Sequence, residues 1–176
     1  MATMGIELTS SGEDAVRELL LSRLGPAFRI ANAILRDPAA AEDAVQDAAL
    51  RAWAKRLELR DPDKVDAWFA RIVVNVCRGE LSRPRPTRLE TMPERPVEPN
   101  DRWTLREETG RAIARLTPDE QVVLALRFGR DMTVPQIAAS TGLREGTVKS
   151  RLHSAQQHLR AAFEAERRAD AAAEVG

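Results

Sequence analysis

A proline-rich segment near the middle of this 176-residue chain limits its possible folds more than any other feature. The segment from Ser82 to Asn100 contains five of the ten prolines in the sequence. Proline lacks a backbone donor and clashes with the preceding helical turn, so the segment cannot be a continuous helix. It also has few apolar side chains to bury, which is typical of a semi-extended linker. We therefore expect the chain to be divided at this segment.

Helix signals are frequent on both sides of the segment, and no stretch shows sustained strand-like alternation. A capping side chain precedes a proline at Asp37-Pro38, Asp61-Pro62 and Thr117-Pro118. Thr133 and Gln136 fit a capping box, and Gly25-Pro26 is expected to break the N-terminal helix. These signals predict helices at about 12–24, 26–36, 38–57, 63–82, 101–115, 118–129, 134–140 and 145–165.

The sequence therefore predicts an all-α fold of two small helical domains joined by the proline-rich linker. We expect the first domain at 10–83, the linker at 84–100 and the second domain at 101–166. Each domain is short, so each is expected to have a modest core of its own. The net charge is zero, so any binding of nucleic acid must use local basic patches. No apolar run approaches the ~20 residues that span a bilayer, so we expect a cytoplasmic protein without a membrane partner.

The sharpest local signal lies between Met132 and Arg160. A short predicted helix ends at Gly142, which suits a left-handed turn, and a longer helix follows closely. One apolar stripe on the longer helix must face a core, and it consists of Val148, Leu152, Ala155 and Leu159. Its opposite face is polar, and residues 142–160 carry four basic side chains and one acidic one. Such a helix fits the major groove of DNA, although an ordinary helical hairpin with a solvated face has the same spacing.

The predicted helix over 38–57 has two contrasting faces. Its apolar stripe consists of Ala41, Val45, Ala48 and Ala52. Directly opposite are Asp43, Gln46, Asp47 and Leu50, which place one apolar side chain among acidic ones. A partner surface with a basic rim would complement this face. A single surface leucine beside solvated charges is the alternative interpretation.

The predicted helix over 63–82 carries two parallel lines of side chains. The core stripe is formed by Val65, Phe69, Ile72 and Val76. The second line is formed by Trp68, Arg71, Asn75, Arg78 and Ser82. An aromatic ring, two guanidinium groups and an amide in one row can stack on unpaired bases and bind phosphates. A half-buried tryptophan beside solvated arginines would give the same pattern.

The hairpin between Met132 and Arg160 carries a family motif. Gly146-Thr147-Val148-Lys149-Ser150-Arg151-Leu152, preceded by Gln136-Ile137-Ala138 and followed by Leu159-Arg160, resembles the helix-turn-helix of the sigma-four domain in extracytoplasmic-function (ECF) sigma factors. The resemblance implies that this helix reads the minus-thirty-five promoter element. The implied contact residues are Arg144, Glu145, Thr147, Lys149, Ser150 and Arg151. Thr141, Arg144 and Ser154 depart from the residues that the family commonly has, which affects promoter preference and not the fold.

The N-terminal half resembles the sigma-two domain of the same sigma-70 family. Ala41 to Asp47, with Leu50 and Ala52-Trp53, resembles the segment that grips a coiled coil of the largest polymerase subunit. The polymerase contacts implied are Glu42, Asp43, Gln46, Asp47 and Leu50. Trp68-Phe69 with Arg71-Ile72, Asn75 and Arg78 resembles the minus-ten recognition helix, which captures flipped non-template bases. The minus-ten contacts implied are Trp68, Arg71, Asn75, Arg78 and Arg83.

The resemblance implies a sigma factor that directs promoter-specific transcription initiation and is not an enzyme. Its implied partners are core RNA polymerase, promoter DNA and an anti-sigma factor. We expect no cofactor and no metal, because His153 and His158 lack partners at metal-ligand spacing. Cys77, the single cysteine, lies near the core stripe and is interpreted as a small buried hydrophobe.

Two other functions remain open from the sequence. One is an autonomous helix-turn-helix transcriptional regulator with an N-terminal helical dimerisation domain. The other is a purely protein-binding helical adaptor. The row that begins at Trp68 separates these from a sigma factor, because a regulator has no need of a stacking side chain beside the linker.

Overall fold

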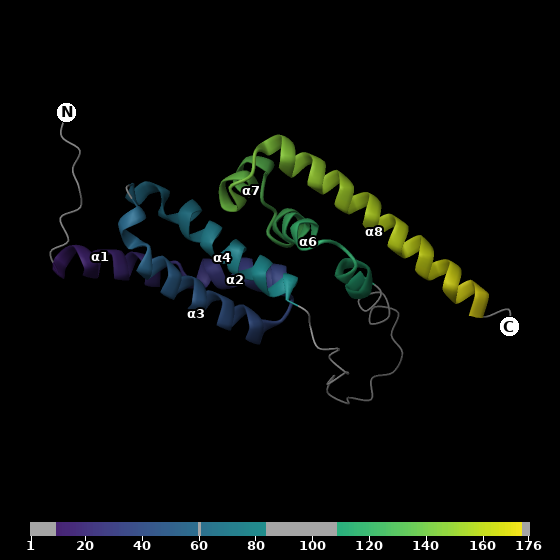
Figure 1. Cartoon of the computed structure of the whole chain (residues 1–176), viewed down its shortest axis with the longest axis horizontal. Coiled ribbons are helices and arrows are strands. Elements are labelled where there is room, and N and C mark those ends of the chain that lie inside the picture. The colour runs from purple at the N-terminus through teal and green to yellow at the C-terminus, as the bar shows by residue number, and fades with distance from the viewer. Residues whose placement is uncertain (1–9, 60, 84–108, 174–176) are drawn as a thin grey trace.

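The computed structural model describes residues 10–59, 61–83 and 109–173, and within these ranges it contains helices and no strand. The N-terminal half consists of α1 (Ser10–Leu21), α2 (Leu24–Leu35), α3 (Pro38–Ala54), two 3-10 turns (Arg56–Glu58 and Pro62–Lys64) and α4 (Val65–Ser82). The C-terminal half consists of helical residues at 109–114, α6 (Pro118–Leu124), a π-helical turn (Ala125–Gly129), α7 (Val134–Thr141) and α8 (Glu145–Ala173) (Figure 1). The predicted all-α class is confirmed. The predicted linker at 84–100 and the start of the predicted helix at 101–115 lie outside the described residues.

The expected caps begin several of these helices. The Asp37 carboxylate accepts hydrogen bonds from the backbone N–H groups of Ala39 and Ala40 at the start of α3. A capping box begins α6, where the Glu120 carboxylate accepts from the Thr117 N–H at 3.0 Å. Each side-chain acceptor satisfies a backbone donor that has no partner within the first helical turn.

Several helix boundaries differ from the sequence prediction, and α3 ends at Ala54 and not at residue 57. The first two helices separate at Ser22 and Arg23, not at Gly25-Pro26, because the first turn of α2 tolerates a proline that lacks a backbone donor. Asp61 caps only a 3-10 turn, through the Asp63 N–H at 3.1 Å, so α4 begins at Val65. At the other end of the chain, α8 continues to Ala173 and not to residue 165.

The N-terminal half is a bundle in which α2, α3 and α4 pack against one another. The predicted alanine-rich stripe of α3 is fully or almost fully buried, and its small side chains allow the neighbouring helices to approach closely. On α4, Phe69 and Val76 are buried as expected, and Val73 and Cys77 join them.

The core does not stop at the boundary between the two halves. Ile137 of α7, Leu126 of the π-helical turn and Val148 of α8 belong to the same buried cluster as Phe69 and Val73 of α4. Helix α7 lies against α4, and the π-helical turn lies against α2 (Figure 1). The larger core therefore extends across both halves, because the apolar faces of α4 and α7 cover each other, and a small separate cluster of Leu116, Leu124 and Ala155 lies within the C-terminal half.

Candidate functional site

The outer face of α3 presents the acidic and apolar side chains that the sequence singled out. Glu42, Asp43 and Gln46 are exposed, and Leu50 is 71% exposed. Asp47 is half-buried and forms an ion pair with Arg51 one turn later, with 2.8 Å between Arg51 Nη2 and the carboxylate. The negative rim of this face therefore comes chiefly from Glu42 and Asp43, which form no ion pair with the described residues.

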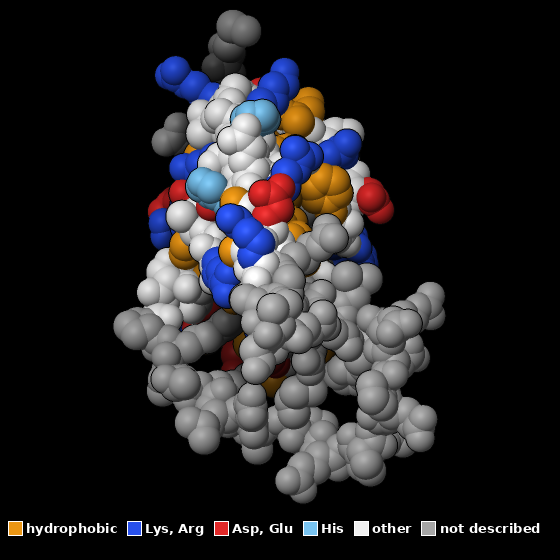
Figure 2. Space-filling model, turned by 90° about the vertical axis from the view of Figure 1, so that its right-hand side faces the viewer, with side chains coloured by type: hydrophobic (Ala, Val, Ile, Leu, Met, Phe, Trp, Pro, Cys, Tyr) orange, Lys and Arg blue, Asp and Glu red, His pale blue; other side chains and the backbone are white. Residues whose placement is uncertain are grey.

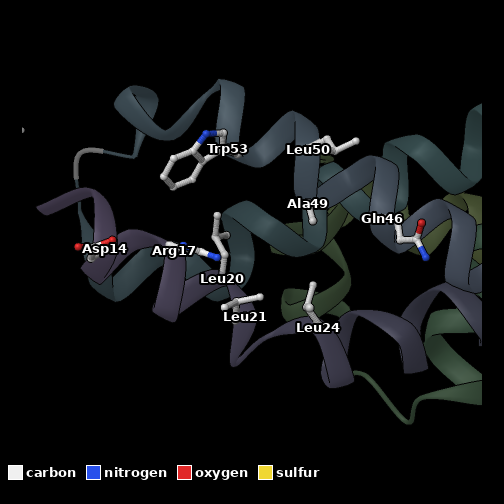
Figure 3. A pocket seen from close by; sticks show the side chains of 9 residues that line it. All are labelled: Asp14, Arg17, Leu20, Leu21, Leu24, Gln46, Ala49, Leu50 and Trp53. Atoms are coloured by element: carbon white, nitrogen blue, oxygen red, sulfur yellow. The ribbon is translucent and has the colours of Figure 1, made fainter. Parts of the chain in front are cut away.

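An apolar groove continues this face toward α1. Leu20 and Leu21 of α1 and Leu24 of α2 line one side, and α3 lines the other with Gln46, Ala49, Leu50 and Trp53 (Figure 3). The groove has a volume of about 760 Å³ and ends near Asp14 and Arg17. The Trp53 ring is covered by the Arg56 guanidinium, 4.7 Å from the ring centroid. The sequence indicated Leu50 but not this groove, because the groove forms only where α1 meets α3.

The α4 row that the sequence predicted is assembled on one side of the helix, but two of its members contact the C-terminal half. Arg71 donates to the backbone carbonyl of Ala139 on α7 at 3.3 Å. Arg78 Nε lies 2.8 Å from Oδ1 of Asp119 on α6. Trp68 is half-buried against the core, whereas Asn75 is exposed. Arg83 lies at the C-terminal end of α4 and pairs with Glu80 at 2.6 Å.

The helix-turn-helix has the turn that its sequence predicts. Gly142 has a φ of 75°, and its N–H bonds the Ala138 carbonyl at 2.9 Å, which ends α7. The buried Thr141 hydroxyl donates to the Ile137 carbonyl at 2.7 Å, so the threonine closes the last turn of α7 by a hydrogen bond. After Leu143 and Arg144 the chain enters α8 at Glu145.

The predicted minus-thirty-five residues differ in exposure. Four of them are exposed at the start of α8 or just before it: Arg144, Glu145, Lys149 and Ser150. Thr147 is half-buried, and Arg151 Nη2 lies 2.9 Å from Asp119 Oδ2. Basic side chains are interspersed with acidic and apolar ones on the end of the molecule shown in Figure 2.

Asp119 was missed by sequence reasoning as a member of this arrangement. In the sequence it is simply the third residue of a capping-box motif, Thr117 to Glu120. In the structure its two carboxylate oxygens contact Arg78 of the N-terminal half and Arg151 of the C-terminal half. No local pattern signals this role, because the three residues are far apart in the chain.

Glu120 is a second polar centre that sequence reasoning treated only as a cap. Its buried carboxylate accepts from the Thr117 backbone, the Thr117 hydroxyl and the Ser154 hydroxyl, and it lies 2.9 Å from Nδ1 of His158. Burial raises the pKa of Glu120, but this effect is outweighed by the hydrogen bonds from Ser154 and Thr117 and by the nearby His158. The net result is a pKa of Glu120 below its ordinary value. Glu120 therefore stays ionised and ties α6 to α8.

Cys77 is fully buried in α4. Burial raises the pKa of its thiol from 9.0 to about 12, against the lowering effect of a backbone hydrogen bond. A thiol that remains protonated and covered is a poor nucleophile, in agreement with the interpretation of Cys77 as a core side chain.

Comparison with known proteins identifies the family. The family model for Sigma-70 region 2 matches residues 19–86, and the model for Sigma-70, region 4 matches residues 112–161. The RNA polymerase sigma-E factor of Streptomyces coelicolor is 32% identical over 150 residues, which cover 81% of this chain and 82% of that protein. The ECF RNA polymerase sigma factor SigL of Mycobacterium tuberculosis is 33% identical over 145 residues, which cover 76% of this chain and 80% of that protein. This chain is an ECF sigma factor of the sigma-70 family.

Two solved structures have the same fold. The RpoE sigma factor of Bartonella quintana, in a co-crystal with the anti-sigma factor NepR, aligns with a TM-score of 0.55 and 24% identity over 86% of this chain and 98% of that one. CnrH, in complex with the cytosolic domain of CnrY, aligns with a TM-score of 0.57 and 23% identity over 92% of this chain and 93% of that one. No helix in the described ranges of this sigma factor is long and apolar enough to span a membrane.

The family assignment confirms the main functional interpretation of the sequence. The protein is an RNA polymerase sigma factor that directs promoter-specific transcription initiation, and the curated relatives favour this function over an autonomous regulator. Sigma factors are initiation factors and not enzymes. The individual contact residues inferred from the sequence remain predictions.

Proposed function

We propose that this ECF sigma factor divides its contacts among three surfaces and catalyses no reaction itself. The outer face of α3, with its groove toward α1, binds core RNA polymerase. The α4 row holds the melted minus-ten strand, and the helix-turn-helix of α7 and α8 reads the minus-thirty-five element. Residues 10–83 thus serve polymerase and minus-ten binding, and residues 101–166 serve minus-thirty-five binding, with 84–100 as the linker.

The exposed apolar edge of the α3 groove is the observation that carries this proposal. Leu50 and Leu21 are 71% and 56% exposed beside the groove. Large apolar side chains gathered at a groove are costly to leave in water, so they favour a protein partner that covers them. Glu42 and Asp43 add negative charge beside them, which favours a partner with a basic rim.

Base stacking supports the role of α4. Trp68 is half-buried, so its ring is held in place and retains an accessible part. Asn75 is exposed on the same row and adds an amide that can bond to a base edge. Stacking of a base on an aromatic side chain contributes about 1–3 kcal/mol, so this row is suited to a few unpaired nucleotides.

An anti-sigma factor is the third partner that we propose. The solved relative RpoE is bound to the anti-sigma factor NepR. This sigma factor shares its fold with that protein over 86% of its length. We place the chain in the cytoplasm, where core polymerase and promoter DNA are available.

The decisive experiment for the DNA role is promoter opening by a Trp68→Ala, Asn75→Ala double variant with purified core polymerase. Permanganate footprinting of unpaired thymines reports opening directly. We expect opening to be lost on a duplex promoter and partly restored on a template with a premelted bubble, while core binding is retained. Arg29→Ala, which removes an exposed arginine from α2, and Phe69→Leu, which disturbs the core alone, are the controls. Normal opening by the double variant would refute the role of the row.

A further inference from the structure

One carboxylate joins the two DNA-binding surfaces. Asp119 lies near the start of α6, and its Oδ1 is 2.8 Å from Nε of Arg78 on α4. Its Oδ2 is 2.9 Å from Nη2 of Arg151 on α8. Arg78 belongs to the proposed minus-ten row, and Arg151 to the proposed minus-thirty-five surface. The Asp119 side chain thus forms ion pairs with one arginine from each of the two proposed DNA-binding surfaces.

We infer that Asp119 is an autoinhibitory latch that takes the place of a DNA phosphate and holds the two halves in a closed form with low DNA affinity. This inference rests on the proposed DNA-binding roles of Arg78 and Arg151. A guanidinium binds carboxylate and phosphate oxygens with the same planar fork of donors. Asp119 and the DNA backbone therefore compete for the same two side chains.

A third predicted DNA contact also touches the C-terminal half in the same closed form, although its side chain remains exposed. The Arg71 guanidinium donates to the Ala139 carbonyl at 3.3 Å, and its side chain lies over Gly142 at the turn of the helix-turn-helix. A Cβ placed on Gly142 would lie 3.2 Å from Arg71 Nε. The closed form therefore also places the minus-ten row against the end of α7, where the Arg71 guanidinium uses one of its donors within the protein.

Close packing between the halves shows that they fit together over more than the ion pairs. Gly129, at the end of the π-helical turn, faces α2, where a Cβ placed on the glycine would lie 3.3 Å from the Cβ of Ala33. The buried cluster shared by α4 and α7 lies in the same contact. A residue with a Cβ at position 129 would require Ala33 to give way by a few tenths of an ångström, so glycine suits this close contact.

The latch is built to open. Arg78 Nε and Asp119 Oδ1 face each other at 2.8 Å without the geometry of a hydrogen bond, and the buried Arg151 Nη1 forms no hydrogen bond with the described residues. Buried polar atoms left without hydrogen bonds are costly, and these three regain partners on exposure to water or phosphate. The closed form is therefore held by ion pairs that contacts between the two arginines and DNA phosphates can replace.

The magnitude follows from the number of ion pairs. Each partly exposed pair favours the closed form by a factor of about 1.4 to 5, so loss of both pairs shifts the closed-to-open ratio by about two- to thirtyfold. When the closed form predominates, the apparent DNA affinity of the free protein rises by the same factor, because affinity scales with the binding-competent fraction.

The test uses the full chain with fluorescent labels on α3 and α8. Donor and acceptor dyes are attached to cysteines introduced at the exposed positions Ala54 and Ala161, in a Cys77→Ala background. Energy transfer reports the distance between the halves, and anisotropy of a mixed-sequence duplex reports DNA affinity without polymerase. We expect Asp119→Asn to lower energy transfer and to tighten duplex binding by about two- to thirtyfold.

Asp66→Asn is the matched control for the charge. Asp66 is likewise an acid in the first turn of a helix, and its carboxylate lies 2.9 Å from an arginine, Arg23, but both residues belong to the N-terminal half. The Asp66→Asn substitution removes the same negative charge without altering Asp119 or its two arginine partners, so energy transfer should be unchanged. Gly129→Ala alters no charge, and we expect it to open the closed form by crowding Ala33. Its control is Gly79→Ala, because a Cβ at position 79 meets open space.

The outcomes separate the latch from the proposed function. Lower energy transfer in both Asp119→Asn and Gly129→Ala, with their controls unchanged and circular dichroism normal, supports the latch. Parental energy transfer in Asp119→Asn, or the same gain in duplex affinity in Asp66→Asn, overturns it. Promoter-specific transcription by the parent with core polymerase is measured separately. A latch that fails in a protein that initiates transcription leaves the proposed function intact.

Discussion

The α3 groove allows core polymerase binding to be weakened at one side chain without disturbing the fold. Leu50→Ala removes three carbon atoms from a side chain whose residue is 71% exposed in the free protein. Each buried methylene group contributes about 0.8 kcal/mol, and most of this leucine is still available for burial by a partner. The expected loss of binding free energy is about 1.5–2 kcal/mol, which corresponds to a roughly 10- to 30-fold higher Kd for core polymerase.

Competition binding to purified core polymerase without DNA measures this effect. Leu57→Ala is a matched control, because Leu57 is 65% exposed in the 3-10 turn after α3 and does not line the groove. The control should change the Kd by less than about twofold, since a solvated leucine that no partner covers loses little on truncation. Leu21→Ala, on the other wall of the groove, should weaken binding in the same direction as Leu50→Ala.

Two results would refute this reasoning. If Leu50→Ala binds core polymerase as tightly as the parent, with unchanged circular dichroism, the leucine is an ordinary surface residue. If Leu57→Ala weakens binding as much as Leu50→Ala, the effect comes from general surface hydrophobicity and not from the groove.

Three further predictions follow from individual side chains. Glu120→Gln should lower the free energy of unfolding at pH 7 by about 1–3 kcal/mol in urea titrations, because a buried charged acceptor is lost. The pKa of Glu120 is lower in the folded state, so the stabilisation that its carboxylate provides is fully present above the unfolded value of 4.5. This stabilisation is lost as the pH falls through the folded-state pKa. A difference in unfolding free energy between parent and Glu120→Gln that persists at acid pH would contradict this. Gly79→Ala should stabilise the protein by about 0.5–1 kcal/mol in thermal melts, since the added Cβ meets open space in the helix α4, and a lower melting temperature would contradict this. Lys149→Ala should weaken minus-thirty-five binding for all sequences and reduce the salt slope by about 1, whereas Arg144→Ala should change the preferred bases in a promoter library.

Much of the local structure could be predicted because its causes are local. Asp37, Thr117 and Thr133 are each followed closely by the backbone donors or side chains that complete a cap, so the sequence contains all the partners. The boundary at Gly25-Pro26 was predicted wrongly for a related reason. A proline signals that a helix cannot continue through it, but the same residue is tolerated in the first turn of the next helix.

The candidate surfaces were predictable only as single faces of single helices. Periodicity placed Leu50 opposite the buried alanine stripe of α3, and the structure agrees. The groove beside Leu50 could not be predicted, because its other wall comes from α1 and from the angle at which α1 meets α3. Likewise, Glu120 was identified as a cap, but its contact with Ser154 and His158 depends on how α6 packs on α8.

The helices, the polymerase and DNA motifs and the membership of the ECF sigma factors could all be inferred from the amino-acid sequence, because each signal depends on residues within about two helical turns of one another. The position of Asp119 between Arg78 and Arg151, and the contact between the apolar faces of α4 and α7, became visible only in the folded chain. These contacts join residues separated by the central segment of the chain. Their geometry is set by helix packing and by the room left at Gly129 and Gly142, which no periodicity in the sequence encodes.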